Sequence, residues 1–402
     1  MRDTGLSYGR FVAGDPLRGI AALGVALLHA TGNTAVQTGG FGDRGSATLG
    51  TLEAAYGSVF ASLMYGGGVG VLVFFVLSGY LIGGRYARQA VGRTASQSVP
   101  AYLRNRVLRI VPAYWVVLVA VAVVYGLLLD EARVSLDSVL ALAVFDVNAD
   151  NPLTPWFGQA WTLEVEAKFY VLMAGLALTL LPAIRRIPGG LAVRTAAVVA
   201  PCLAWYAYAT LLSDLGSSPH SFGYCLSLLL AGTAIGAIEP LARPRVAGLA
   251  RAGAVGAAMA VAGGAYVLGV AWLGQAVGGV FDPLDGGGLL ALAIVAIVAG
   301  PVVAQWGTGG CWRALDNRAL QWVGRRSYSL YLVHLALQWP IIELLSELGL
   351  GHQATLAIVI PVSLAVSLAA ADLLYRVVER PFLERKRSGR AVETPSLAKA
   401  PA

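Results

Sequence analysis

One arginine and one histidine in an apolar segment near the N-terminus are the residues best suited to chemistry. Arg18 and His29 belong to the run Asp15-Pro-Leu-Arg-Gly-Ile-Ala-Ala-Leu-Gly-Val-Ala-Leu-Leu-His29. In an α-helix this separation is about three turns, so both side chains project from nearly one face, about 16 Å apart along the axis. An ionisable group within a membrane span costs about 2.5–3.5 kcal/mol and usually marks function. The pair suggests proton-transfer chemistry linked to an anion-binding site.

The composition indicates a membrane protein. The chain is 57% hydrophobic and 13% charged, with a mean hydropathy of +0.69, whereas soluble domains carry about 25% charged residues. We predict an all-α, polytopic integral membrane protein with about ten transmembrane helices. The predicted spans lie near residues 17–31, 66–84, 111–129, 161–181, 195–212, 222–238, 253–276, 287–306, 327–347 and 354–376. The apolar piece 136–145 is too short to cross and is interpreted as an interfacial or re-entrant helix.

The distribution of basic residues predicts the orientation. Nearly all of the 29 Lys and Arg residues lie in the segments on one side of this arrangement. The other side holds only Arg44 and Arg133, and Lys168 lies within a span. By the positive-inside rule the rich side is cytoplasmic, so both termini are predicted to be cytoplasmic in a multi-pass plasma-membrane protein. Topology and anionic membrane lipids explain the net charge of +7, and no nucleic-acid partner is implied.

The domain organisation is predicted to be simple. Residues 1–382 form one membrane domain, and residues 383–402 form a disordered, basic cytoplasmic tail. The four histidines and three cysteines are scattered along the chain without metal-ligand or disulfide spacing, so we predict no metal. The Ala-, Gly- and Arg-rich composition is typical of a bacterial protein encoded by GC-rich DNA.

Several segments, taken in order, resemble the acyltransferase type 3 family of integral membrane acyltransferases, from Asp15 to Phe382. The segments are Arg18 through His29, Gly68 through Ile82, Arg104-Asn-Arg-Val-Leu-Arg-Ile-Val-Pro-Ala-Tyr-Trp115, Trp161-Thr-Leu-Glu-Val-Glu-Ala-Lys-Phe-Tyr170, Gly324 through His334, and Glu379-Arg-Pro-Phe382. The resemblance implies a transfer of an acyl group, commonly acetyl, from cytoplasmic acyl-CoA to a hydroxyl group of a glycan or a small glycosylated metabolite.

The resemblance also implies roles for particular residues. His29 matches the catalytic residue of an Arg-ten-residues-His signature that begins at Arg18. The Phe-Phe-x-x-Ser-Gly motif falls on Phe74 to Gly79, which includes Ser78, and the Arg-x-x-Arg motif falls on Arg106 and Arg109. The chain departs from the common Trp-Ser-Leu-Ser-Val-Glu-Glu-Gln-Phe-Tyr pattern at Glu164, Ala167 and Lys168, while Glu166 still matches its first acid.

Each candidate residue also has a structural interpretation. His29 and His334 could be hydrogen-bonded structural histidines, the latter beside Tyr328. Arg106 and Arg109 could be positive-inside anchors, although their i,i+3 spacing puts both guanidinium groups on one helix face, where a phosphate could be held. Ser78-Gly79 could be a tight helix crossing. Glu164 and Glu166 point in different directions on a helix, and Lys168, four residues after Glu164, could pair with it.

The mechanism that we predict uses these residues together. Arg18, Arg106 and Arg109 hold the phosphates of acyl-CoA, and Ser78, Tyr328 and His334 contribute to substrate binding. His29 takes the proton of the acceptor hydroxyl, and Glu166 orients and stabilises the imidazolium. A transient acyl-His29 that carries the acyl group outward is the alternative. The donor acyl-CoA is a substrate, and no cofactor is predicted.

Two other function classes remain open. A transporter or exporter of an acylated or anionic metabolite would also combine about ten spans with buried charges, but such folds often carry internal repeats, and we find none here. A membrane scaffold or lipid-binding protein would have no need of His29 in an apolar face. Release of CoA by purified protein, with and without a hydroxyl acceptor, distinguishes these classes.

Overall fold

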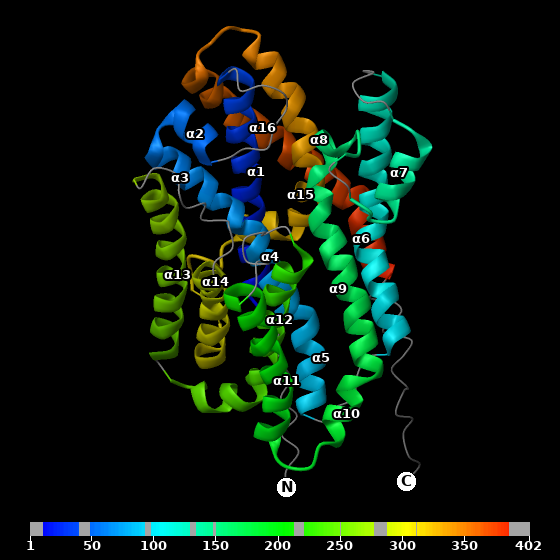
Figure 1. Cartoon of the computed structure of the whole chain (residues 1–402), viewed down its shortest axis with the longest axis vertical. Helices are drawn as coiled ribbons and strands as arrows, with labels where there is room; N and C mark the ends of the chain where they lie inside the picture. The colour runs from blue at the N-terminus through cyan, green and yellow to red at the C-terminus, as the bar shows by residue number, and fades with distance from the viewer. Residues whose placement is uncertain are drawn as a thin grey trace, which may run out of the picture. The chain divides into compact units, whose positions relative to one another are not determined.

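A computed structural model describes residues 11–39, 49–92, 98–128, 134–147, 150–212, 221–249, 251–276, 288–310 and 312–385. Every regular element within these ranges is a helix, which confirms the predicted all-α class (Figure 1). The prediction of a disordered tail concerns residues 383–402, of which 386–402 lie outside the described ranges.

Ten helical segments of the described chain are long and apolar enough to cross a membrane, and each contains most of one predicted span. They cover Gly14–Gln37, Ser58–Val91, Val99–Leu128, Thr154–Arg186, Leu191–Leu211, Phe222–Val246, Arg251–Val270, Gly288–Thr308, Arg318–Ser346 and Gln353–Arg385. Most are longer than predicted, because helices continue through flanking Arg and Glu residues that a hydropathy pattern leaves out. The cytoplasmic location of the termini stays a prediction.

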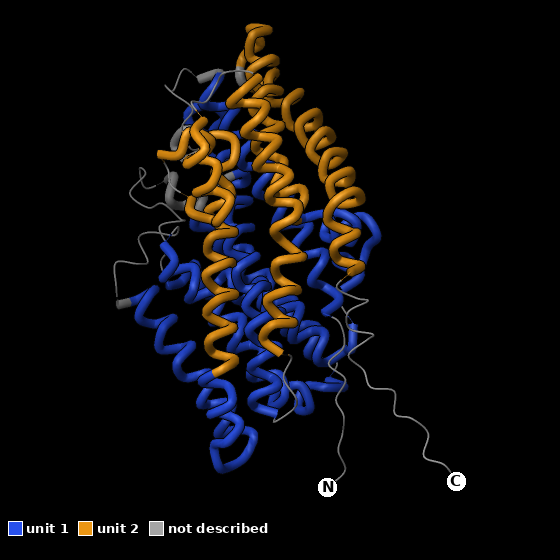
Figure 2. The backbone as a smooth tube through the Cα atoms, turned by 90° about the vertical axis from the view of Figure 1, so that its right-hand side faces the viewer, with its two compact units in different colours: residues 1–96, 179–327 blue, residues 97–178, 328–402 orange. Residues whose placement is uncertain are grey.

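The chain divides into two compact units, which are described separately (Figure 2). Unit 1 comprises residues 1–96 and 179–327, and unit 2 comprises residues 97–178 and 328–402. The helices of unit 1 are α1 (Gly14–Gly39), α2 (Leu49–Tyr56), α3 (Ser58–Gly66), η1 (Gly67–Val69), α4 (Gly70–Ser78), η2 (Gly79–Gly83), α5 (Gly84–Val91), α10 (Leu180–Arg186), α11 (Leu191–Ala207), η5 (Tyr208–Leu212), α12 (Phe222–Val246), α13 (Arg251–Ala276), α14 (Gly288–Thr308) and the first part of α15 (Arg318–Ser346).

Unit 2 is built around two long helices and the C-terminal part of the chain. Its helices are α6 (Val99–Val121), η3 (Ala122–Leu128), α7 (Leu136–Ala143), α8 (Thr154–Phe157), η4 (Gly158–Ala160), α9 (Trp161–Leu178), the rest of α15, α16 (His352–Leu374) and η7 (Tyr375–Glu379). The short α7 covers the piece predicted to be too short to cross. It is tied to α6, because the Tyr114 hydroxyl donates to the Leu142 carbonyl at 2.7 Å and the Trp115 indole donates to Ala143 at 3.0 Å.

Helix α1, which carries Arg18 and His29, is held in unit 1 by backbone contacts at glycines. Asp15 and Pro16 occupy its first turn, where an acidic side chain suits the helix dipole and the fixed φ of proline is tolerated. A Cβ added at Gly24 would lie 2.8 Å from the Gly67 carbonyl oxygen, and one at Gly19 would lie 2.9 Å from that of Leu320. Such close approach needs residues without side chains, so α1 is fixed against η1 and the start of α15.

Candidate active site

The structure places the predicted site residues in both units. Arg18, His29 and Ser78 belong to unit 1, and the other five belong to unit 2, namely Arg106, Arg109, Glu166, Tyr328 and His334. The expected contact between His29 and Glu166 therefore joins residues of different units, and it stays a prediction.

Within unit 1, Arg18 and His29 are both half-buried on α1. Two residues beyond His29, the Thr31 hydroxyl donates to the Leu27 carbonyl at 2.8 Å. Because the fold fixes α1 through Gly19 and Gly24, the helix presents the imidazole on a rigid element. A half-buried imidazole on a fixed helix is suited to general-base chemistry.

Ser78 lies in a tight helix crossing, as its structural interpretation predicts. It is 1% exposed at the junction of α4 and η2. A Cβ added at the next residue, Gly79, would lie 2.0 Å from the Leu229 carbonyl oxygen of α12, and one at Gly232 would lie 2.1 Å from that of Val76. The Phe-Phe-x-x-Ser-Gly segment is therefore packed backbone to backbone against α12, and the predicted part of Ser78 in substrate binding stays a prediction.

Within unit 2, Arg109 lies at the centre of a buried polar cluster. Its Nη1 lies 2.9 Å from Oε1 of Glu379, a carboxylate whose side chain has 0% exposure. The other carboxylate oxygen of Glu379 accepts a hydrogen bond from the Ser329 hydroxyl at 2.8 Å. Tyr170, Tyr328 and Glu166 also lie close enough to act electrostatically on Arg109. The cluster joins α6, α9, α15 and η7, so one guanidinium ties together segments from the whole length of unit 2.

Arg106, one turn before Arg109, has different surroundings. Its guanidinium carbon lies 5.6 Å from the ring centroid of Tyr102 and 5.6 Å from that of Tyr170. These are cation–π distances, which suit a guanidinium stacked on aromatic rings. Its buried Nε has no hydrogen-bond partner, and no ion pair joins it to any residue of the described ranges. Of the two arginines of the motif, Arg109 is therefore paired with a carboxylate and Arg106 lies against aromatic rings.

The two glutamates of α9 differ as the sequence suggested. Lys168 Nζ lies 2.5 Å from Glu164 Oε1, which confirms that these two residues can simply pair. Glu166 instead accepts a short hydrogen bond from the Tyr170 hydroxyl and contributes to the field at Arg109. Glu166 is thus the acid of α9 that faces the buried polar cluster of unit 2.

Tyr328 and His334 are both tied to backbone in unit 2. The Tyr328 hydroxyl donates to the Ile110 carbonyl at 2.7 Å. His334 is 1% exposed, and its Nδ1 lies 2.8 Å from the Tyr331 carbonyl oxygen. These contacts fit the structural interpretation of His334, and its proposed part in substrate binding stays a prediction.

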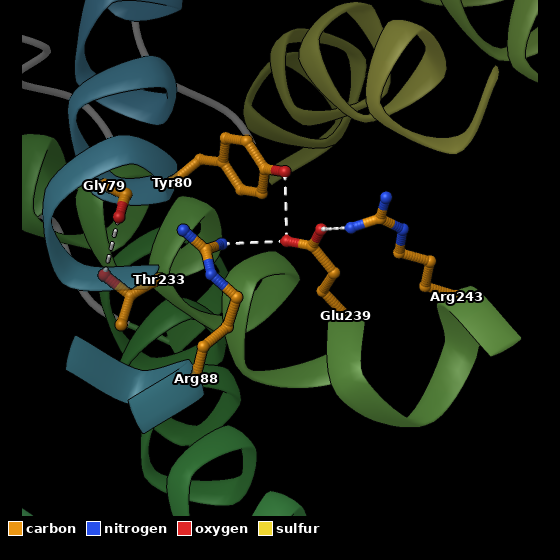
Figure 3. Close-up of polar contacts among 6 residues, drawn as sticks. All are labelled: Gly79, Tyr80, Arg88, Thr233, Glu239 and Arg243. Carbon is orange, nitrogen blue, oxygen red and sulfur yellow. Dashed lines mark hydrogen bonds and ion pairs between the residues drawn. The ribbon is translucent and has the colours of Figure 1, made fainter. Parts of the chain in front are cut away.

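A second buried carboxylate, in unit 1, was missed by the sequence reasoning. Glu239 of α12 is 4% exposed and accepts hydrogen bonds from the Tyr80 hydroxyl at 3.1 Å and from Arg88 Nη1 at 2.9 Å (Figure 3). It also forms an ion pair with Arg243, whose Nη1 lies 3.6 Å away. The sequence did contain a sign of this site, because Glu239 is a single acidic residue in an apolar span and lies four residues before Arg243. Its contacts with Tyr80 of η2 and Arg88 of α5 depend on the packing of the helices and are not visible in the sequence.

The described residues hold no group of three or more His, Cys, Asp or Glu side chains placed to bind a metal ion. Each unit offers chemistry of its own. In unit 1, the imidazole on a fixed helix suits proton transfer. In unit 2, the arginine between aromatic rings suits the binding of an anionic group.

Comparison with known proteins agrees with that chemistry. A family model described as an acyltransferase domain matches residues 14–376. The exopolysaccharide production protein ExoZ of Rhizobium meliloti (strain 1021) is 30% identical over 331 residues, which are 81% of this chain and 92% of that protein. The peptidoglycan O-acetyltransferase OatA of Listeria monocytogenes serovar 1/2a is 25% identical over 340 residues, 79% of this chain and 51% of that protein. No solved structure shows a significant match.

Proposed function

The chain belongs to the acyltransferase type 3 family, and we propose that it moves an acetyl group from acetyl-CoA to a hydroxyl group of a polysaccharide at the plasma membrane. It is an acyltransferase and a multi-pass membrane protein. The family match from residue 14 to residue 376 carries the proposal, because it spans α1 with Arg18 and His29 as well as the polar cluster of unit 2.

The class of acceptor is proposed from the two relatives. One is named for exopolysaccharide production and the other for O-acetylation of peptidoglycan. Both names point to a glycan outside the cytoplasm. A polysaccharide hydroxyl is therefore our proposed acceptor, ahead of a small glycosylated metabolite. The transporter alternative has no specific observation in its favour.

The proposed chemical step needs a base and a water-poor site. Neutral His29 accepts the proton of the acceptor hydroxyl as its oxygen attacks the thioester carbonyl. The C–S bond then breaks, and the acetyl group stays on the oxygen as an ester. The sulfur of CoA takes the proton from the His29 imidazolium, so CoA leaves as a thiol and His29 is neutral again. General-base help of this kind contributes about 10²–10⁴-fold. Exclusion of water matters, because water would otherwise hydrolyse the activated acyl group.

The proposed donor, acyl-CoA, carries several phosphate groups. Cationic residues near the predicted cytoplasmic boundary suit such a polyanion, and Arg18, Arg106 and Arg109 are the candidates. Sealed, inverted membrane vesicles that contain the protein test the proposal directly. With radiolabelled acetyl-CoA outside and an exopolysaccharide or peptidoglycan fragment inside, we expect alkali-labile radiolabelled ester on the glycan. Labelled glycan that is equally abundant in vesicles without the protein would contradict the proposal.

A further inference from the structure

Gln159 of η4, in unit 2, carries a buried carbonyl oxygen that the protein leaves without a hydrogen bond. The side chain is 3% exposed. Its Nε2 donates to the Leu332 carbonyl of α15 at 2.8 Å, whereas its Oε1 has no hydrogen-bond partner among the residues that the structure describes. Buried polar groups are satisfied in the large majority of cases, so this exception needs an explanation.

The contact with Leu332 fixes the orientation of the Gln159 amide. A backbone carbonyl can only accept a hydrogen bond, so the end of the amide that faces it must be the NH2 group. The other end is therefore the carbonyl oxygen, which can only accept. A ligand that matches this oxygen must present an O–H or N–H group to it.

The contacts around Gln159 hold it in place and are all uncharged. The Tyr331 hydroxyl donates to the Gln159 backbone carbonyl at 3.2 Å and accepts from the Thr162 hydroxyl at 3.0 Å. One turn earlier in the chain, the Trp339 indole donates to the Pro155 carbonyl at 3.0 Å. Because none of these contacts involves an ionised side chain, the arrangement suits an uncharged group better than a phosphate or a carboxylate.

The position of Gln159 in its span indicates the class of ligand. The span Thr154–Arg186 ends with Arg185 and Arg186, on the basic side that is predicted to be cytoplasmic. Gln159 lies near the opposite end, which is predicted to face outward. It precedes Glu166 by seven residues, which is about two helical turns or about 10 Å along the axis. A hydroxyl group of a glycan outside the cytoplasm supplies the O–H that Oε1 lacks.

We propose that Gln159 binds the glycan acceptor, with its Oε1 accepting a hydrogen bond from a sugar hydroxyl. Because Glu166 is the acid predicted to act in the chemical step, a hydroxyl held two turns away is not the one that is acetylated. The inference rests on the proposed function for the identity of the acceptor. It deepens that function, because it names a residue that selects the glycan by its pattern of hydroxyl groups.

Binding of glycans to purified full-length protein tests this assignment. The probes are de-O-acetylated exopolysaccharide oligosaccharides and, in a second arm, de-O-acetylated peptidoglycan fragments. Gln159→Met removes the acceptor oxygen at nearly constant size, and we expect it to raise the Kd of the glycan that binds about threefold to tenfold. The Kd of CoA should stay the same. Thr162→Val is the matched control, because it removes a hydrogen bond of the same cluster and leaves the Gln159 amide in place, and it should change neither Kd.

Glycan analogues that lack single hydroxyl groups give a second readout. The unaltered protein should bind one monodeoxy analogue about threefold to tenfold more weakly than the parent glycan. Gln159→Met should bind that analogue and the parent equally well, because the hydroxyl has lost its partner. A purely structural role for Gln159 does not remove this discrimination.

Several results would overturn the assignment. One is an unchanged glycan Kd in Gln159→Met, and another is unaltered protein that binds neither probe. A rise in the Kd of CoA as well, or an equal rise in Thr162→Val, would reduce Gln159 to a structural role. Discrimination against the deoxy analogue that survives in Gln159→Met would move the contact to another residue. If Met is not accommodated, Gln159→Asn, which withdraws the amide by one methylene group, is judged by the same affinities.

These outcomes are separable from those of the proposed function. Protein that binds a glycan through Gln159 as described, yet transfers no acetyl group to it, would refute the function and leave the glycan contact standing. Protein that transfers acetyl normally and shows an unchanged KM for the glycan in Gln159→Met would refute the glycan contact alone.

Discussion

At the scale of single residues, unit 2 contains two ion pairs of different kinds, one within a single helix and one between residues far apart in the chain. The Glu164–Lys168 pair follows from a four-residue spacing on one helix, and the sequence indicated it. The Arg109–Glu379 pair joins residues that are far apart along the chain, so no local spacing in the sequence indicates it. In the sequence, an i,i+3 arginine pair has the same appearance whether or not a distant carboxylate pairs with one of its members. The place of Arg109 in the donor site stays a prediction.

The Glu379 carboxylate makes a prediction about stability. Glu379→Ala leaves the buried Arg109 guanidinium without its counter-ion, and we expect a loss of about 3–5 kcal/mol in the free energy of unfolding. Denaturant unfolding in detergent measures this loss. Glu384→Ala is the control, because the Arg380–Glu384 pair is exposed and its removal should cause no measurable loss. Equal stability of the Glu379 and Glu384 variants would contradict the description of Glu379 as a buried counter-ion.

At the scale of elements, the ten spans were predicted because their apolar length shows in the sequence. The way in which these spans pack against one another could be predicted only in part from the sequence. The small-residue pair Gly232 and Gly236 indicated a packing helix, but not that Gly79 and Gly84 are its partners. Which helix packs against α12 depends on which backbone segments come together in the fold. A local sequence pattern within one helix does not show which distant helix that is.

The crossing of η2 with α12 gives a prediction at this scale. A methyl group at Gly79 would lie 2.0 Å from a backbone oxygen, so Gly79→Ala must push the helices apart. We expect a loss of about 1–3 kcal/mol in stability, as for other overpacked sites. Gly264→Ala is the matched control, since a Cβ there meets nothing within 4 Å, and it should be neutral or stabilising. Thermal unfolding in detergent compares the two, and a neutral Gly79→Ala would refute the tight crossing.

For the whole molecule, the asymmetry of basic residues predicts its orientation in the membrane. In a cysteine-free variant, single cysteines at Arg2 and Asp150 should react with an impermeant thiol reagent from opposite sides of the membrane. We expect labelling at position 150 in intact cells and at position 2 only after the membrane is opened. Labelling of both positions from outside would refute the ten-span topology with cytoplasmic termini.

The central claim is that His29 carries the transfer of the acyl group, and its replacement tests the claim most directly. His29→Ala should insert, fold and bind CoA like the unaltered protein, because α1 is held through glycine contacts that do not involve the imidazole. The rate of acetyl transfer from acetyl-CoA to glycan should nevertheless fall by at least about 100-fold. A folded His29→Ala protein that transfers acetyl at a near-normal rate would contradict the account.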